Sequence, residues 1–221
     1  MRIRVKFTRE DRVKFLGHLD IMRSFQRCFN RAHIKMIYSE GFNPHQKMNF
    51  AQPLGVGVLS RGDYLDAEVE EGQDPLDIMN RMNEKIGEGF KVTECRILEE
   101  KAEKCMAALG FADYEIRVNE GRVPDISHFL EAEKAVTLKK SKSGEKEVDI
   151  KPLVAELSRG DDENMIKMRL HAGSEDNLNP VLLMQVLYGM EGLPFERYMI
   201  SVIRTEMYTK DMVPLSRYQT L

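Results

Sequence analysis

MRIRVKFT, residues 1–8, alternates between basic or polar and apolar side chains along almost its whole length. The apolar side chains are Ile3, Val5 and Phe7, and the basic side chains are Arg2, Arg4 and Lys6. Successive side chains of a strand point to opposite faces, so this alternation predicts a strand with one face in the core.

The rest of the first hundred residues alternates between helical and strand patterns. In chain order we expect a strand at 1–8, a helix at 18–33, strands at 35–39 and 63–71, a helix starting at 75, and a strand at 90–98. Asp74 as N-cap and Pro75 at the first helical position mark the start of the second helix. The order β-α-β-β-α-β is that of a ferredoxin-like unit, with an antiparallel sheet and both helices on one face.

Residues 101–221 follow this rhythm more loosely. We expect a strand at 113–118, a helix at 124–133, a hairpin at 135–150 turning at residues 142–145, a strand at 164–172, a helix after Asn179-Pro180, and a strand at 197–208. The predicted fold class is therefore α+β, with two tandem ferredoxin-like units, the second with extra β structure. The predicted domains are 1–100 and 101–221, and the tail at 211–221 is expected to be loosely ordered.

Charge is distributed unevenly along the chain. Residues 1–61 hold 12 Lys and Arg against 4 Asp and Glu, a balance of 12 − 4 = +8. The remaining residues hold 33 − 12 = 21 basic and 36 − 4 = 32 acidic side chains, a balance of −11. This asymmetry indicates an anionic partner for the first segment, although the two segments could also neutralise each other within one fold.

Composition narrows the class of protein. The three cysteines are scattered, without the spacing of a zinc site or of an iron–sulfur cluster, so we expect no metal and no cofactor. No apolar run approaches the ~18 residues of a membrane helix, and the N-terminus lacks the apolar core of a signal peptide. We therefore expect a cytoplasmic protein without a membrane partner.

Arg23, Arg27 and Arg31 recur every four residues within the first expected helix. This spacing places them on one face, away from the core, and arginine clusters suit phosphate or carboxylate recognition. The alternative is an ordinary solvated helix face.

The basic face of the first strand admits two interpretations. It could bind RNA, but it offers no aromatic side chain on which a base could stack. In the ferredoxin-like order the first and third strands are neighbours, and Arg2, Arg4 and Lys6 would then face the acidic residues Asp66, Glu68 and Glu70. We favour this pairing of charges.

The segment Tyr38–Phe50, YSEGFNPHQKMNF, is a polar loop that contains several aromatic residues. Gly41 permits a positive φ, and Pro44 restricts Asn43 to extended conformations. Binding residues are concentrated on such loops. The candidate binding residues of the loop are Tyr38, Ser39, Phe42, Asn43, His45 and Lys47.

His18, His45 and Asp20 are the candidate catalytic residues. A histidine could act as a general base on RNA, but only geometry can establish that role. With Glu40 they could also form a metal site, yet no HxH or HxxxH spacing supports one, so no metal ligand is predicted.

Residues 13–58 resemble the signature region of the radical SAM-linked family, a bacterial domain of unknown function found alone or fused to radical SAM proteins. The matching residues are His18, Leu19, Asp20, Arg23, Tyr38, Ser39, Gly41, Phe42, Asn43, Pro44, His45, Phe50, Leu54 and Gly55. The chain departs from the pattern at Gly17, Gln46, Lys47, Asn49 and Gln52-Pro53. The resemblance implies a radical SAM protein as partner.

These observations lead to three functional hypotheses. The first is an accessory recognition module that binds an anionic substrate, RNA or a ribosomal component but not DNA, for a separate radical SAM enzyme. The second is an RNA-processing or RNA-modifying enzyme that uses His18 or His45. The third is a protein-interaction scaffold.

Overall fold

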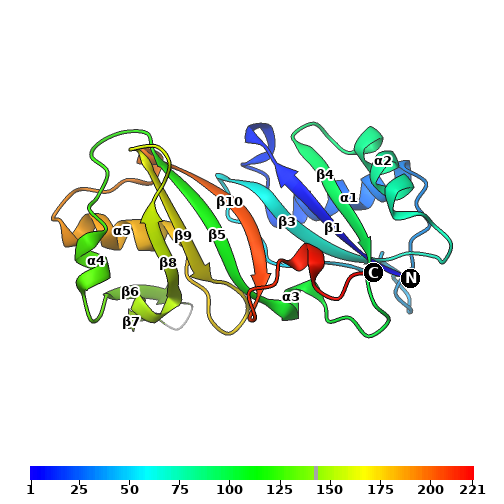
Figure 1. Ribbon diagram of the computed structural model, residues 1–221. Coiled ribbons are helices and arrows are strands. Elements are labelled where there is room, and N and C mark those ends of the chain that lie inside the picture. Colours follow the sequence, from blue (N-terminus) through cyan, green and yellow to red (C-terminus); the bar gives the residue numbers. More distant parts are fainter. Residues whose placement is uncertain (142–143) are drawn as a thin grey trace. The chain divides into compact units, whose positions relative to one another are not determined.

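The computed structural model describes residues 1–141 and 144–221 and has a mixed α+β architecture with mostly antiparallel strands (Figure 1). The chain forms two compact units, Met1–Gly110 with Arg204–Leu221, and Phe111–Ile203. The predicted division into domains at residues 100 and 101 stays a prediction. None of the helices in these described residues is long and apolar enough to cross a bilayer.

The first unit contains the expected order of elements. They are β1 (Arg2–Arg9), α1 (His18–Arg31), β2 (Met48–Phe50), β3 (Val58–Glu68), α2 (Pro75–Lys85), β4 (Phe90–Ile97) and the short α3 (Cys105–Ala108). β1 pairs antiparallel with β3 and β4, and β2 pairs antiparallel with β3. The β-α-β-β-α-β order of this half is confirmed, whereas the tandem ferredoxin-like arrangement stays a prediction.

The second strand lies later in the chain than the sequence pattern predicts. Residues 35–39 form only isolated bridges, Met36 with Val69 and Tyr38 with Gln46. The chain turns back on itself after Tyr38, and the edge of β3 is then taken by β2, where Met48 pairs with Ala67. Because Tyr38 pairs with Gln46 of the same loop, residues 35–39 do not continue as a strand along β3.

Charge pairing between β1 and β3 is confirmed for the central pair. Arg4 lies opposite Asp66, with Nε 2.8 Å from Oδ1 and Nη2 3.0 Å from Oδ2. Arg2 lies opposite Glu68, as expected. Lys6 differs, because it lies opposite Tyr64 and its Nζ is 2.7 Å from Oε2 of Glu206.

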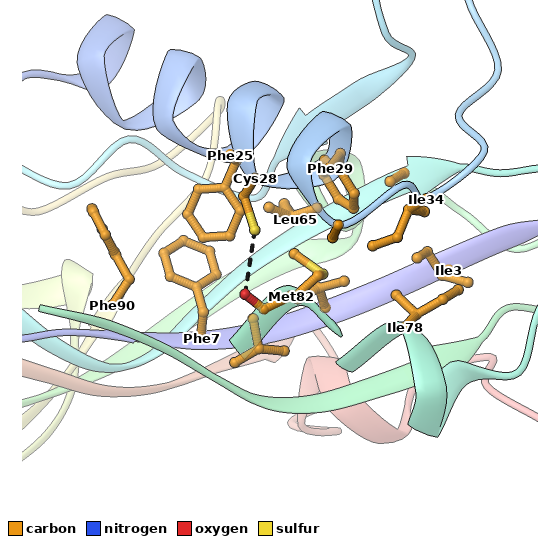
Figure 2. Close-up of a cluster of buried hydrophobic side chains, with 14 of the residues drawn as sticks. Ile3, Phe7, Phe25, Cys28, Phe29, Ile34, Leu65, Ile78, Met82 and Phe90 are labelled. Atoms are coloured by element: carbon orange, nitrogen blue, oxygen red, sulfur yellow. Dashed lines mark hydrogen bonds between the residues drawn. The ribbon is translucent and has the colours of Figure 1, made fainter. Parts of the chain in front are cut away.

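The helices α1 and α2 bury their apolar residues against the sheet of the first unit. Figure 2 shows Phe25 and Cys28 of α1 over Phe7 of β1, with the Phe7 and Phe25 ring centroids 4.5 Å apart. The Cys28 thiol donates to the carbonyl of Met82 in α2 at 3.5 Å (Figure 2). This core fixes the orientation of α1 and thereby determines which of its residues face outward.

The C-terminal tail is ordered, in contrast to the expectation from sequence. It forms a 3₁₀ turn at Leu215–Arg217, and the Leu215 side chain is fully buried. The carbonyls of Leu215 and Tyr218 accept from Nη1 of Arg4 at 3.0 and 3.1 Å. The buried guanidinium of Arg4 needs these acceptors, and supplying them holds the tail in place.

Gly62 marks a close approach between β3 and the last part of β10 (Ile200–Thr209). A Cβ atom at this position would lie 2.5 Å from the carbonyl oxygen of Thr205. Only glycine therefore fits here.

The second unit is built from several strands and two helices of its own. Its elements, besides the start of β10, are β5 (Leu109–Val118, which begins in the first unit), α4 (Ser127–Glu131), β6 (Val136–Ser141), β7 (Gly144–Asp149), β8 (Val154–Arg159), β9 (Met165–His171) and α5 (Pro180–Met190). β9 pairs antiparallel with both β5 and β8, and β6 pairs with β7. Of the predicted hairpin turn at 142–145, residues 142–143 lie outside the described residues.

The start of α5 agrees with its sequence signal. Oδ1 of Asn179 accepts from the backbone N–H of Val181 at 2.9 Å, and Pro180 takes the first helical position. β8 had no counterpart in the sequence prediction, because its residues VAELSR do not alternate between apolar and polar side chains.

Candidate functional site

The outer face of α1 carries the three arginines identified from the sequence. At about 100° per residue, Arg23, Arg27 and Arg31 span an arc of about 80°. All three are exposed, whereas Phe25 and Cys28 on the opposite side are fully buried. The helix therefore presents a basic face to solvent, as predicted.

The three arginines differ in their partners. Nη2 of Arg31 donates to the carbonyl of Lys85 at the end of α2, at 2.6 Å, which ties this side chain to the fold. Nη1 of Arg23 lies 3.8 Å from Oδ1 of Asp20, and both side chains are exposed. Within residues 1–141 and 144–221, the side chain of Arg27 makes no hydrogen bond or ion pair. Arg27 and Arg23 are thus the side chains of this face most available to a ligand.

The loop after α1 is closed by bonds at its base. Ser39 N–H donates to the carbonyl of His45 at 2.8 Å, and His45 N–H donates to Oγ of Ser39 at 3.0 Å. Oγ of Ser39 also lies 2.8 Å from Nδ1 of His45. Gly41, with φ of 110°, allows the chain to reverse between them. Ser39 and His45 therefore hold a short loop whose tip is residues 40–44.

The tip of this loop projects into solvent. Phe42 is fully exposed and Asn43 is also exposed, while Tyr38 at the base is 46% exposed. The Phe42 ring thus remains in water and offers an apolar surface at the tip of the loop.

Gln46 fastens the loop to α1. Its buried side-chain amide donates to Oδ1 of Asn30 at 2.7 Å and to the carbonyl of Gln26 at 3.4 Å. Asn30 adjoins Arg23 and Arg27 on the helical surface, at spacings of seven and three residues. The exposed loop, residues 38–47, and the basic face of Arg23, Arg27 and Arg31 therefore adjoin, and we call this candidate surface the loop–helix site.

The sequence did not single out Gln46 or Asn30 as site residues. Both are polar residues among other polar residues, and no spacing connects position 46 with position 30. Lys47, which the sequence did single out, lies at the margin, because its Nζ is 3.3 Å from Oε2 of Glu68 in β3.

The candidate catalytic residues occupy separate local environments. The His18 ring packs edge-on against Phe50, with centroids 5.3 Å apart, whereas His45 is bonded to Ser39. In the part of the chain that the structure describes, no hydrogen bond joins His18, His45 and Asp20. Residues 1–141 and 144–221 contain no cluster of three or more His, Cys, Asp or Glu side chains that could hold a metal ion.

The first unit is thus an α+β unit that presents a basic helix face with an exposed loop fastened to it. The chain belongs to a family of uncharacterized proteins conserved in bacteria, DUF2344, whose family model matches residues 2–180. This range includes every residue of the loop–helix site. No curated protein matches the chain.

Proposed function

We propose that this protein is an accessory recognition module that binds an anionic substrate, RNA or a ribosomal component, at the loop–helix site. The observation that carries the proposal is the fastening of Gln46 to Asn30, which places the exposed Phe42 loop on the helix of Arg23 and Arg27. Arginines neutralise phosphates, and exposed aromatic rings stack on unpaired bases.

Single-stranded RNA suits this combination better than duplex nucleic acid. Base stacking on Phe42 or Tyr38 requires a base that is free of its own stack, as in RNA loops and bulges. We do not propose DNA as its ligand, because an exposed aromatic ring beside the arginines suits unpaired bases rather than a duplex.

Binding of a labelled single-stranded RNA, titrated at several salt concentrations, tests the proposal. The logarithm of the association constant should fall linearly with the logarithm of salt concentration. Arg27→Ala should weaken binding and reduce the slope by about 0.7, the contribution of one phosphate contact to a single strand. Phe42→Ala should weaken binding without changing the slope, because stacking releases no counterions.

Arg12 offers a matched control for this titration. Its side chain is exposed and, among the residues that the structure describes, pairs only with Glu88. Arg12→Ala should leave RNA binding unchanged. Binding that is absent, or that is insensitive to salt and to Arg27→Ala, would rule out the RNA proposal.

The second part of the proposal is that the module serves a separate radical SAM enzyme. It rests on the resemblance of residues 13–58 to the radical SAM-linked signature. The proposed architecture, two tandem ferredoxin-like units, leaves the redox chemistry to the partner. Copurification of a radical SAM protein with the tagged chain, retained after nuclease treatment, supports this part, and its loss with nuclease would show that RNA alone bridges them.

An RNA-processing activity is the second candidate function, because one observation favours it. Nδ1 of His45 is held by Ser39, which orients the exposed imidazole as a catalytic base would be oriented. Labelled RNA incubated with the protein should then be cleaved or modified, and His45→Gln should abolish the change. Unaltered RNA of all classes would exclude this candidate.

A further inference from the structure

Arg9, the last residue of β1, is a buried cation with too few acceptors. Like Ile3, Val5 and Phe7, it occupies an odd-numbered position of β1 whose side chain faces inward, and it is 1% exposed. Nη2 reaches the carbonyls of Val13, Lys14 and Leu16 only at 3.3 to 3.5 Å, which are long bonds. Nε and Nη1 are buried without any hydrogen-bond partner. Three of its five N–H donors therefore lack an acceptor.

The charges around Arg9 do not balance. Arg204, also 1% exposed, donates from Nε and Nη2 to Oδ1 of Asp63 at 3.0 and 2.7 Å. Oγ of Ser60 donates to the same oxygen at 2.6 Å. Asp63 is thus bonded to Arg204 and Ser60, and it acts on Arg9 only through its charge.

Electrostatics agree with this geometry. Burial lowers the pKa of Arg9, and Arg204 lowers it further, while Asp63 acts in the opposite direction. Arginine nevertheless remains protonated in proteins. The three side chains Arg9, Arg204 and Asp63, taken by themselves, sum to one positive charge.

Two segments without helix or regular strand enclose this cluster. The first, residues 14–17, supplies two of the carbonyls near Arg9, and its Lys14 carbonyl accepts from Gly57 N–H at 2.7 Å. The second, residues 51–57, contacts Arg204 through Gln52, whose Oε1 and carbonyl oxygen are each 3.2 Å from its guanidinium. The charged cluster thus lies under loops rather than within the helix-covered core.

An unpaired buried charge is costly, and native proteins supply it with partners. The fully buried guanidinium of Arg4 follows that rule, since it is bonded to Asp66 and to three backbone carbonyls. Arg9 departs from it in both charge and hydrogen bonding. A group that brings acceptor oxygens and one negative charge would correct both deficits at once.

We propose that Arg9 is the recognition residue of an internal site for a small oxyanion of the phosphate class with a single negative charge. The site is separate from the loop–helix site and does not depend on RNA binding. Nε and Nη1 of Arg9 would donate to the oxygens of the anion, and the excess positive charge of the cluster would be neutralised.

Thermal unfolding of the full chain in inorganic phosphate tests this inference. The buffer should be mildly acidic, where phosphate is mostly singly charged, and potassium chloride of equal ionic strength is the reference. The unfolding midpoint should rise with the logarithm of the phosphate concentration, by about 5 °C at about ten times the dissociation constant, as expected for a ligand that binds only the folded state. The rise should disappear in Arg9→Met.

The phosphate-free stability of Arg9→Met is a second readout. Replacing a poorly paired buried charge by an apolar side chain of similar length is often neutral or stabilising. The variant should therefore unfold at the same temperature as the wild type or higher without phosphate, and at a lower temperature with it. If Arg9→Met does not fold, Arg9→Lys keeps the charge but loses the fork of donors, and should show a smaller phosphate shift.

Control variants and a second anion separate the possible outcomes. Arg12→Met and Arg27→Ala should retain the full phosphate shift, since neither side chain belongs to the cluster. A shift equal in wild type and Arg9→Met would overturn the inference, as would the absence of a shift, which would mean that water alone satisfies Arg9. A shift with formate but not with phosphate would assign the site to carboxylates and reject the phosphate class.

Discussion

Arg4 shows how a single side chain can join distant parts of this chain. Its guanidinium is 1% exposed and forms a two-bond ion pair with Asp66. Oδ2 of Asp66 also accepts from the backbone N–H of Cys105 at 2.7 Å. The remaining donors of Arg4 reach carbonyls of Glu103, Leu215 and Tyr218. The pair thus connects β1 and β3 with two later segments of the chain.

Removing one member of this pair should lower the free energy of unfolding far more than removing both charges. Arg4→Met leaves the Asp66 carboxylate buried without its cation, and we expect the free energy of unfolding to fall by about 3–5 kcal/mol. Arg4→Met with Asp66→Asn removes both charges and keeps an acceptor for Cys105, so it should recover part of this loss. Urea denaturation of the three proteins measures the effect, and a double variant no more stable than the single one would contradict it.

The buried thiol of Cys28 makes the free energy of unfolding vary with pH in the alkaline range. Burial raises its pKa from 9.0 to about 11. The thiol in the unfolded chain ionises first, so the stabilising contribution is complete below about pH 9 and is lost as the pH rises through about 11. The loss is on the order of 3 kcal/mol.

Urea denaturation from neutral pH to pH about 11 checks this prediction, with Cys28→Ala as the comparison. Other groups also titrate in this range, so the informative quantity is the difference between the two pH profiles. The Cys28→Ala profile should be flatter. Parallel profiles would mean that the ionisation of Cys28 is not linked to folding.

At the scale of elements, the connection between α1 and the following loop controls the loop–helix site. Gln46 holds the loop through its amide nitrogen, while its Oε1 is buried without a hydrogen-bond partner. Gln46→Ala therefore removes one good interaction and one unsatisfied atom together. The global cost should be small, about 1 kcal/mol or less, whereas the loop should become mobile.

Hydrogen exchange followed by mass spectrometry distinguishes this local effect from a global one. Peptides that cover residues 38–47 should exchange faster in Gln46→Ala, and peptides from β1 and β3 should not. Gln73→Ala is a suitable control, because the Gln73 amide bonds to the backbone outside the loop: Nε2 donates to the carbonyls of Lys35 and Glu70, and Oε1 accepts from the N–H of Lys35. Unchanged exchange in 38–47 would mean that Ser39 and His45 suffice to order the loop.

The sequence predicted those elements whose signals are local. Asp74 and Pro75 marked the start of α2, and the alternation of Ile3, Val5 and Phe7 marked β1, because caps and periodicity depend only on neighbouring residues. The second strand was predicted too early, since its position depends on how the loop bonds to itself. The arginines of α1 were likewise predicted from their spacing alone.

Site residues that depend on distant contacts could not be predicted in this way. Arg9 has an inward position in the alternation of β1, which was the only local sign of its burial. Its relation to Asp63 and Arg204 depends on strands that meet only in the folded chain. The pairing of Gln46 gave no local signal, because its partner Asn30 lies on a different element.

At the scale of the whole molecule, the first compact unit contains both ends of the chain. The tail bonds to β4 through Leu221 N–H and the carbonyl of Ile97, at 2.9 Å, and Glu99 N–H donates to the carbonyl of Gln219 at 3.0 Å. Leu215 is fully buried within this arrangement. Completion of the unit therefore requires the last residues of the chain, although the family model matches only residues 2–180.

Loss of the tail should consequently destabilise residues at the opposite end of the sequence. A chain ending at Lys210 lacks Leu215 and two of the carbonyls that accept from Arg4, so the buried guanidinium is left with unsatisfied donors. Leu215→Ala isolates the packing part of this effect and should lower the free energy of unfolding by about 2–5 kcal/mol. Leu221→Ala is the control, because its side chain is largely exposed and its loss should leave the free energy of unfolding almost unchanged. Truncation should lower the free energy of unfolding more than Leu215→Ala does, because it removes hydrogen bonds as well as packing. In the truncated chain, the backbone amides of β1 should also lose hydrogen-exchange protection. If the truncated chain kept the protection of β1 and the stability of Leu215→Ala, then water would satisfy Arg4 as well as the tail does, and the tail would only cover the unit rather than complete it.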